Sequence, residues 1–168
     1  MNYPILEEMF EDESPNSVFE IGVGGGGLLK DLRDTFDCSV GGMDISRVRM
    51  SNLSNVFADT GFLVHDLNDP WPLPDNSYDI VFAVCTLGYV FNPGPVIQEM
   101  FRVARKKVIL AEYHSENTDE YGFLLKATMP DRTETLIARN YVELLKDKNP
   151  QFFKSDSGKT IIKCQKLQ

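Results

Sequence analysis

The strongest constraint on the fold is a run of glycines that directly follows an apolar segment. Five of the six residues from 22 to 27 are glycine, and residues 17–21 before them read SVFEI. Glycine inside a regular element costs about 0.5–1 kcal/mol relative to alanine. The run therefore predicts a turn whose backbone bends sharply or approaches a ligand closely.

Apolar strand patterns alternate with helical patterns around this turn. Such alternation predicts an α/β, Rossmann-like doubly wound sheet, which is mostly parallel. A final pair of strands around Ser157 and Gly158 predicts one antiparallel strand near the C-terminus. Strands are expected at 17–22, 38–44, 61–66, 78–85, 106–113, 151–155 and 159–167, and helices at 28–36, 46–57, 93–104 and 131–148.

Composition indicates one globular domain over residues 1–168. The chain is 42% hydrophobic and carries a net charge of −8, a sign that disfavours broad binding to nucleic acid. No apolar run approaches the length of a membrane span, and the acidic beginning lacks a signal-peptide pattern. We therefore expect a cytoplasmic protein that does not engage a membrane. The three cysteines are far apart and show no metal-ligand or disulfide spacing, so no metal is expected.

Two classes of nucleotide ligand fit the glycine turn. Gly22, Gly24 and Gly27 match the G-x-G-x-x-G pattern of dinucleotide-binding folds, which alone is a weak signal. Asp44 ends the second predicted strand, and its two carboxylate oxygens suit the hydroxyls of a ribose in either class. In a doubly wound sheet such a ligand binds at the carboxyl ends of the strands.

Several motifs taken together resemble class I S-adenosylmethionine-dependent methyltransferases of the small-molecule type. FEIGVGGG at residues 19–26 is similar to the first motif of that family, and GGMDIS at 41–46 is similar to its second-strand motif. The resemblance continues through HDLNDPWPLPDNSYDIVFAVC and the helix QEMFRVAR to about residue 112.

The resemblance implies S-adenosyl-L-methionine as the cofactor and assigns roles along the chain. The backbone of residues 22–26 would lie beside the methionine part, with Glu20 close to the turn. Asp44 would bind the ribose, Ile45 would cover the adenine, and Asp66 and Leu67 would hydrogen-bond it. Residues 85–87 would face the methionine and the reacting centre. The expected cofactor-binding residues are Glu20, Gly22, Val23, Gly24, Gly26, Asp44, Ile45, Asp66, Leu67, Cys85, Thr86 and Leu87.

The sequence departs from the family at two informative places. RKKVIL replaces the Pro-Gly-Gly turn that precedes the fifth strand in the family, which predicts a tighter connection. CTLGYV follows the fourth strand, where enzymes that methylate amino groups of DNA bases carry an Asp/Asn-Pro-Pro-Tyr motif. DNA is therefore not an expected acceptor.

The acceptor side is less defined by sequence. Tyr89, Tyr113 and His114 follow strands that should border the site, and Arg139 and Tyr141 fall on the expected late helix. None of them is assigned as a catalytic residue. Residues 115–130 are expected to form a flap that sets acceptor choice. The acceptor is expected to be a small molecule, saccharide or protein methylated on oxygen or nitrogen, and a second copy of the chain that closes the site is an open alternative.

Two other functions remain open at this point. An NAD-dependent oxidoreductase would place a pyrophosphate at residues 24–27 and would need a parallel sixth strand in place of the terminal hairpin. A non-catalytic subunit that binds the cofactor and activates a partner would keep the same motifs without turnover.

Overall fold

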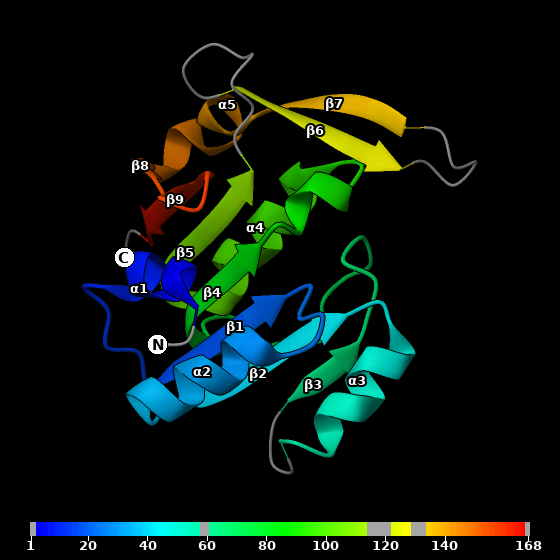
Figure 1. Ribbon diagram of the computed structural model, residues 1–168, viewed down its shortest axis with the longest axis vertical. Coiled ribbons are helices and arrows are strands. Elements are labelled where there is room, and N and C mark those ends of the chain that lie inside the picture. The colour runs from blue at the N-terminus through cyan, green and yellow to red at the C-terminus, as the bar shows by residue number, and fades with distance from the viewer. Residues whose placement is uncertain (1–2, 58–60, 114–121, 129–133, 167–168) are drawn as a thin grey trace.

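The computed structural model describes residues 3–57, 61–113, 122–128 and 134–166. It shows one large sheet with helices on both faces and a separate two-stranded hairpin (Figure 1). The elements in chain order are α1 (Pro4–Phe10), β1 (Ser17–Ile21), α2 (Gly27–Phe36), β2 (Ser39–Asp44), α3 (Arg47–Ser54), β3 (Phe62–Val64), β4 (Tyr78–Val84), η1 (Leu87–Tyr89), α4 (Pro93–Val103), β5 (Ala104–Tyr113), β6 (Gly122–Thr128), β7 (Glu134–Asn140), α5 (Tyr141–Leu145), η2 (Lys146–Lys148), β8 (Gln151–Lys154) and β9 (Lys159–Gln165).

The large sheet has the strand order β3-β2-β1-β4-β5-β9-β8. The first five strands in that order run parallel, whereas β9 is antiparallel to both β5 and β8. The Rossmann-like fold and the antiparallel C-terminal strand predicted from the sequence are confirmed. The β8–β9 pair is the terminal hairpin that an NAD-dependent oxidoreductase was expected to lack, so the topology argues against that alternative.

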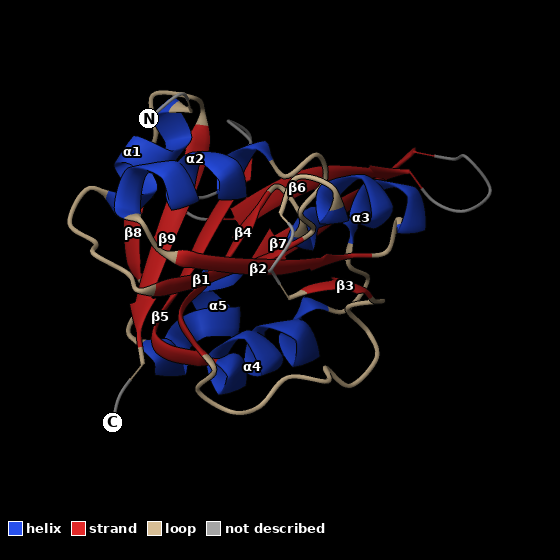
Figure 2. Cartoon of the chain, turned by 90° about the horizontal axis from the view of Figure 1, so that it is seen from below, coloured by secondary structure: helices blue, strands red, loops and turns tan. Residues whose placement is uncertain are grey.

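Two apolar clusters cover the faces of the sheet. Buried side chains of α1, α2 and α3 pack on one face, and those of α4 and α5 pack on the other (Figure 2). Strand β4 contributes to both clusters because its side chains alternate between the faces: Val81 and Ala83 belong to one, Ile80 and Phe82 to the other. A strand covered on both sides explains the nearly continuous apolar sequence there.

The connection from α4 to β5 is as tight as the missing Pro-Gly-Gly motif predicts. Helix α4 ends at Val103 and β5 starts at the next residue. Arg105 and Lys106 then lie 2.8 and 2.9 Å from the carboxylate of Asp79, which is fully buried at the start of β4. A buried carboxylate is costly unless it is paired, so these two cations are structural at this position.

The structure corrects the expected helix at 131–148. Strand β7 occupies most of its first half, because it pairs in antiparallel register with β6 from Gly122↔Asn140 to Thr128↔Glu134. The helix that remains is the single turn α5, and the Asn140 side chain caps it by accepting a hydrogen bond from the Glu143 N–H at 3.0 Å. Pairing with the neighbouring strand of a hairpin has overridden a local helical pattern.

The expected flap at 115–130 stays a prediction, and part of this segment is a strand. Residues 122–128 form β6, one strand of the β6–β7 hairpin, and the remainder of that segment lies outside the described residues. Strand β6 contacts η1, the turn that follows β4. The hairpin therefore lies at the carboxyl end of the sheet, beyond the ends of β4 and β5 (Figure 1).

Helix α1 was not expected from the sequence. It has only seven residues, yet Leu6, Met9 and Phe10 are buried in the same cluster as α2 and the sheet. A helix this short depends on tertiary packing for its stability. Within the described ranges, no helix has the length and apolar character needed to cross a bilayer.

Candidate functional site

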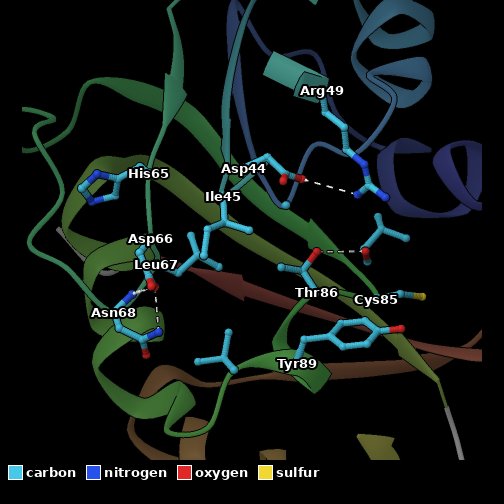
Figure 3. Close-up of a pocket in the computed structure, with 13 residues that line it drawn as sticks. Asp44, Ile45, Arg49, His65, Asp66, Leu67, Asn68, Cys85, Thr86 and Tyr89 are labelled. Atoms are coloured by element: carbon cyan, nitrogen blue, oxygen red, sulfur yellow. Dashed lines mark hydrogen bonds and ion pairs between the residues drawn. The ribbon is translucent and has the colours of Figure 1, made fainter. Parts of the chain in front are cut away.

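A cavity of about 520 Å³ opens at the carboxyl ends of the central strands (Figure 3). In a doubly wound sheet this edge is where ligands bind. The cavity lies between the glycine turn after β1, the ends of β2 and β3, and the turn after β4. Its lining residues are Gly22, Asp44, Ile45, Arg49, His65, Asp66, Leu67, Asn68, Val84, Cys85, Thr86, Tyr89 and Val90.

The glycine turn is built from backbone that other residues adopt only with strain. Gly22, Gly24 and Gly26 have φ angles of 70°, 57° and 73°. At Gly22 an added Cβ would also lie 2.3 Å from the Thr86 hydroxyl oxygen. Glycine is therefore required at this position both by conformation and by space. The result is bare backbone on one wall of the cavity.

Asp44 fastens the turn to the end of β2. One carboxylate oxygen, Oδ2, accepts a hydrogen bond from the Gly24 N–H at 2.9 Å, and Oδ1 accepts one from the Ser46 N–H at 2.8 Å. The side chain is 7% exposed and lines the cavity. A carboxylate oxygen has room for a second donor, so Asp44 can hold the turn and bind the hydroxyls of a ribose together.

Glu20 is buried on β1 two residues before the turn. Its side chain is 2% exposed, and among the described residues no donor reaches its Oε2 atom. Burial raises the pKa of Glu20 well above its ordinary value, and the nearby charge of Asp44 raises that pKa further. An unsatisfied buried carboxyl oxygen at this turn is what a site for a polar ligand or its bound water would contain. Because Glu20 does not line the cavity, the fit to a nucleoside rests on Asp44 and on the bare backbone of Gly22.

Replacing Glu20 with glutamine should make stability less sensitive to pH. Because the folded state holds the Glu20 proton more tightly than the unfolded state, the wild-type protein loses stability as pH rises from the ordinary glutamate pKa toward the raised one. Glutamine does not titrate. We expect the unfolding free energy of Glu20→Gln minus that of wild type to be more positive near pH 8 than near pH 5.

Urea unfolding at both pH values measures this difference. Glu11→Gln is the matched control because it removes an exposed carboxyl group outside the cavity. A Glu20→Gln difference that is the same at both pH values would show that Glu20 is already ionised in the folded protein.

Asp66 and Asn68 form the opposite end of the cavity, after β3. Asp66 Oδ1 accepts hydrogen bonds from the Asn68 backbone N–H at 2.9 Å and from its side-chain amide at 2.7 Å. These bonds lower the pKa of Asp66, so the carboxyl group stays an acceptor at neutral pH. The Trp71 indole N–H donates to the Leu67 carbonyl oxygen at 3.2 Å, which fixes the backbone of the residue after Asp66.

The turn after β4 forms the remaining wall. Cys85 has a φ of 51°, an uncommon conformation for a residue with a side chain. Glu112 on β5 is fully buried, and its Oε1 accepts hydrogen bonds from the backbone N–H groups of Thr86 at 3.2 Å and Leu87 at 2.9 Å. This carboxylate holds the turn in place, a role that the sequence analysis did not assign.

The cofactor-binding residues expected from the sequence lie around this cavity, but not all of them line it. Lining side chains include those of Asp44, Ile45, Asp66, Leu67, Cys85 and Thr86. The side chains of Glu20, Val23 and Leu87 are buried and are not part of the lining, so a contact of Val23 or Leu87 with a ligand would have to come from backbone. Gly24 and Gly26 belong to the turn that carries Gly22.

Among the acceptor-side candidates whose side chains the structure describes, Tyr89 lines the cavity and is 79% exposed. Tyr141 is fully buried in the core and is excluded as a substrate-binding residue. Arg139 lies on β7, not on a helix. His114 and the side chain of Tyr113 are outside what the structure describes.

Sequence reasoning missed Arg49, His65, Asn68, Val84 and Val90 as lining residues. Arg49 carried a usable signal, because it is in the first turn of the helix that begins at Arg47, three residues after Asp44. Among the described residues no group of histidine, cysteine or acidic side chains is arranged to hold a metal ion.

Comparison with protein families shows which family the chain belongs to. Residues 19–111 match the family described as the methyltransferase domain. The chain belongs to this family. Its cofactor is S-adenosylmethionine, in agreement with the glycine turn and the two strand-end acids. The match covers every strand that contributes to the cavity and ends within β5. A sequence comparison with curated proteins finds no match.

Solved methyltransferase structures share the fold of this methyltransferase-domain protein. An S-adenosylmethionine-dependent methyltransferase from Aquifex aeolicus is 18% identical with a TM-score of 0.69, and the alignment covers 97% of this chain and 88% of that one. One from Methanosarcina mazei is 21% identical with a TM-score of 0.65 and 98% of both chains covered. A chain from the complex of the Haloferax volcanii Trm112 methyltransferase activator with a methyltransferase is 18% identical with a TM-score of 0.67, covering 91% and 82%. At these identities the likeness establishes the fold.

Proposed function

We propose that this chain is an S-adenosylmethionine-dependent methyltransferase that methylates oxygen or nitrogen of a small molecule, saccharide or protein. The observation that carries the proposal is the pairing of Asp44 with Gly24 beside the bare backbone of Gly22, at the edge of the sheet where the cavity opens. This pairing joins the turn that would lie against the methionine part to the acid that would bind the ribose.

The other contacts follow from the positions of the lining residues. Ile45 is exposed within the cavity and would cover one face of the adenine. Asp66 would accept a hydrogen bond from the adenine amino group, and the Leu67 N–H would donate to the ring. Cys85 and Thr86, together with the backbone of Leu87, would border the methionine part, on a turn that Glu112 holds.

The bound cofactor supplies a methyl group on a sulfonium, which is already an activated electrophile. The main task of the protein is then to hold the acceptor in line with the methyl group, and positioning alone can supply several kcal/mol. The cavity lining contains no group that must act as a base, and we assign no catalytic residue. Tyr89 and the β6–β7 hairpin near η1 are the elements we propose for holding the acceptor.

Thermal shift assays with two ligands test the proposal. S-adenosylhomocysteine at about 100 times its dissociation constant should stabilise the protein by about 2.7 kcal/mol, whereas NAD should have no effect. Labelled S-adenosylmethionine incubated with fractionated host extract then identifies the pool that receives the methyl group. Stabilisation by NAD alone would overturn the cofactor assignment, and label confined to RNA would overturn the acceptor class.

Replacing Tyr89 with alanine should affect the acceptor and not the cofactor. Tyr89 lies at the cavity mouth, and removing an exposed aromatic contact typically weakens an interaction about 10-fold. We expect methyl incorporation from labelled cofactor to fall by that factor, while affinity for S-adenosylhomocysteine stays within about three-fold. Phe153→Ala, an exposed aromatic side chain on β8, is the control. An equal loss of cofactor affinity would place Tyr89 in the cofactor site instead.

One comparison favours a second candidate, in which turnover requires a partner protein. The solved complex that contains the Trm112 methyltransferase activator shows that a chain of this fold assembles with another protein. In this version the isolated chain binds the cofactor normally and transfers no methyl group until a partner is added. Methyl transfer by the purified chain to any extract pool cleared of protein would contradict it.

A further inference from the structure

Arg49 is a pocket residue with no structural task in the part of the chain that is described. It stands in the first turn of α3, its side chain is 61% exposed, and its guanidinium faces the cavity. Among the described residues the guanidinium donates no hydrogen bond; its nearest charged neighbour is Asp44, whose Oδ2 is 4.0 Å from Nη1. That distance is beyond a hydrogen bond.

Asp44 does not need this cation. Its two oxygens already accept backbone hydrogen bonds from Gly24 and Ser46. An arginine that is close to a satisfied carboxylate and open to the cavity therefore has its donors available for something that enters the cavity. Five N–H donors in a planar fork suit a carboxylate or a phosphate.

The position of Arg49 along the cavity indicates which anion it would meet. In Figure 3 Arg49 and Asp66 lie at opposite ends of a row, with Asp44 and Ile45 between them. If Asp66 meets the adenine and Asp44 the ribose, Arg49 stands beyond the ribose, on the side of the glycine turn. Its Nη1 atom lies 4.0 Å from the point where a Cβ on Gly24 would be. The methionine part of the cofactor is proposed to lie along this turn.

The charges of the cavity agree with this assignment. Arg49 is the only lysine or arginine among the lining residues, beside the acids Asp44 and Asp66. S-adenosylmethionine carries two cationic groups, the sulfonium and the ammonium, and a single anionic group, the α-carboxylate. The Gly24 N–H that could have bound a carboxylate is already donated to Asp44. The fork of Arg49 is then the cationic donor that the described cavity lining offers to the cofactor carboxylate.

We propose that Arg49 binds the α-carboxylate of the cofactor's methionine part and thereby distinguishes S-adenosylmethionine from nucleosides without that group. The inference rests on the proposed function, because it takes the cofactor orientation from Asp44 and Asp66. The inference adds a specificity-determining residue on α3, in addition to the glycine turn and to the strand-end acids Asp44 and Asp66.

A thermodynamic cycle tests the proposal through binding alone. The ligands are S-adenosylmethionine and decarboxylated S-adenosylmethionine, which differ only in the carboxylate, and calorimetry gives the affinity of each. In the wild-type protein, loss of the carboxylate should weaken binding about 10-fold, as expected for a charge-assisted pair that is partly exposed. In Arg49→Met the two ligands should bind within about two-fold of each other. Arg49→Lys should retain part of the preference because it keeps the charge and loses the fork.

Arg47→Met is the matched control. Arg47 is an exposed arginine of the same helix, two residues earlier, and it does not line the cavity. Its replacement changes net charge by the same amount and should leave the preference for the carboxylate near 10-fold.

The outcomes separate this inference from the proposed function. A wild-type protein that binds both nucleosides equally, or an Arg49→Met variant that keeps the full preference, overturns the role of Arg49 while the cofactor assignment stands. Equal losses for both ligands in Arg49→Met also overturn it, because they would place Arg49 at the ribose through Asp44. Failure of wild type to bind either nucleoside, with binding of NAD that depends on Arg49, overturns both proposals and assigns the guanidinium to a pyrophosphate.

Discussion

Replacing Asp44 with alanine is expected to weaken binding of S-adenosylhomocysteine by about 100-fold or more. A hydrogen bond to a charged acceptor is worth about 1.5–3 kcal/mol, and the two ribose hydroxyls would lose their acceptors together. The structure adds a second cause, since the Gly24 and Ser46 N–H groups lose the carboxylate that fixes the turn and the start of α3. The variant should therefore also be less stable than wild type.

Calorimetry on the folded variant measures the loss, and Asp31→Ala is the control. Asp31 is 6% exposed, close to the 7% of Asp44, and it lies on α2 outside the cavity. Asp44→Asn separates the two causes further, because its amide nitrogen would face a backbone N–H at either Gly24 or Ser46. An Asp44→Ala protein that folds and binds the nucleoside as tightly as wild type would show that the ribose binds elsewhere.

The sequence predicted the sheet because the strands follow local patterns, and the candidate cofactor residues were assigned from the same patterns. Apolar runs mark β1 and β4, which are buried on both faces, and the glycine turn follows β1 within the same segment. Strand-end acids such as Asp44 and Asp66 are recognisable from their place after an apolar run. In a parallel sheet the ends of neighbouring strands meet at one edge, so residues that are distant in sequence come together by topology.

The sequence did not predict the elements whose structure depends on pairing or packing with another element. Residues 134–140 contain helix-forming Glu, Leu, Ala and Arg, yet they form β7 because β6 supplies a partner strand. Helix α1 is short and exists through burial against α2 and the sheet. Tyr141 was an acceptor-side candidate on the expected late helix, whereas the structure places it at the start of the short helix α5 with its side chain in the core.

The role of Glu112 shows a further limit of sequence reasoning. A glutamate inside an apolar strand stands out, but nothing in the strand itself tells that its carboxylate reaches the N–H groups of Thr86 and Leu87 on another loop. Arg49 is similar, since its helix is predictable and the direction of its long side chain is not. Contacts that long side chains make with another element can be identified only from a structure. Backbone turns, in contrast, can be predicted from the residue types that they require.

Replacing Gly22 with alanine is expected to give the largest combined effect on folding and binding. Alanine at a φ of 70° costs about 1–2 kcal/mol, and its Cβ would lie 2.3 Å from Oγ1 and 2.5 Å from Cγ2 of Thr86. Overpacking of this kind adds about 1–3 kcal/mol. For a chain of this size the sum should lower Tm by about 5–15 °C. Because Gly22 lines the cavity, we also expect affinity for S-adenosylhomocysteine to fall about 10–100-fold, as the turn and Thr86 move apart.

Gly25 in the same turn provides the matched control for Gly22→Ala. No atom lies within 4 Å of an added Cβ at Gly25, and its φ is not positive, so Gly25→Ala should change stability by less than about 1 kcal/mol. A double variant, Gly22→Ala with Thr86→Ala, removes the two closest atoms and leaves the Thr86 Cβ at 2.9 Å. It should recover part of the loss, by the non-additivity expected for residues in contact. Equal melting temperatures and affinities for Gly22→Ala and Gly25→Ala would mean that the turn tolerates a side chain at Gly22. That result would contradict the proposal that the Gly22 backbone approaches a ligand closely.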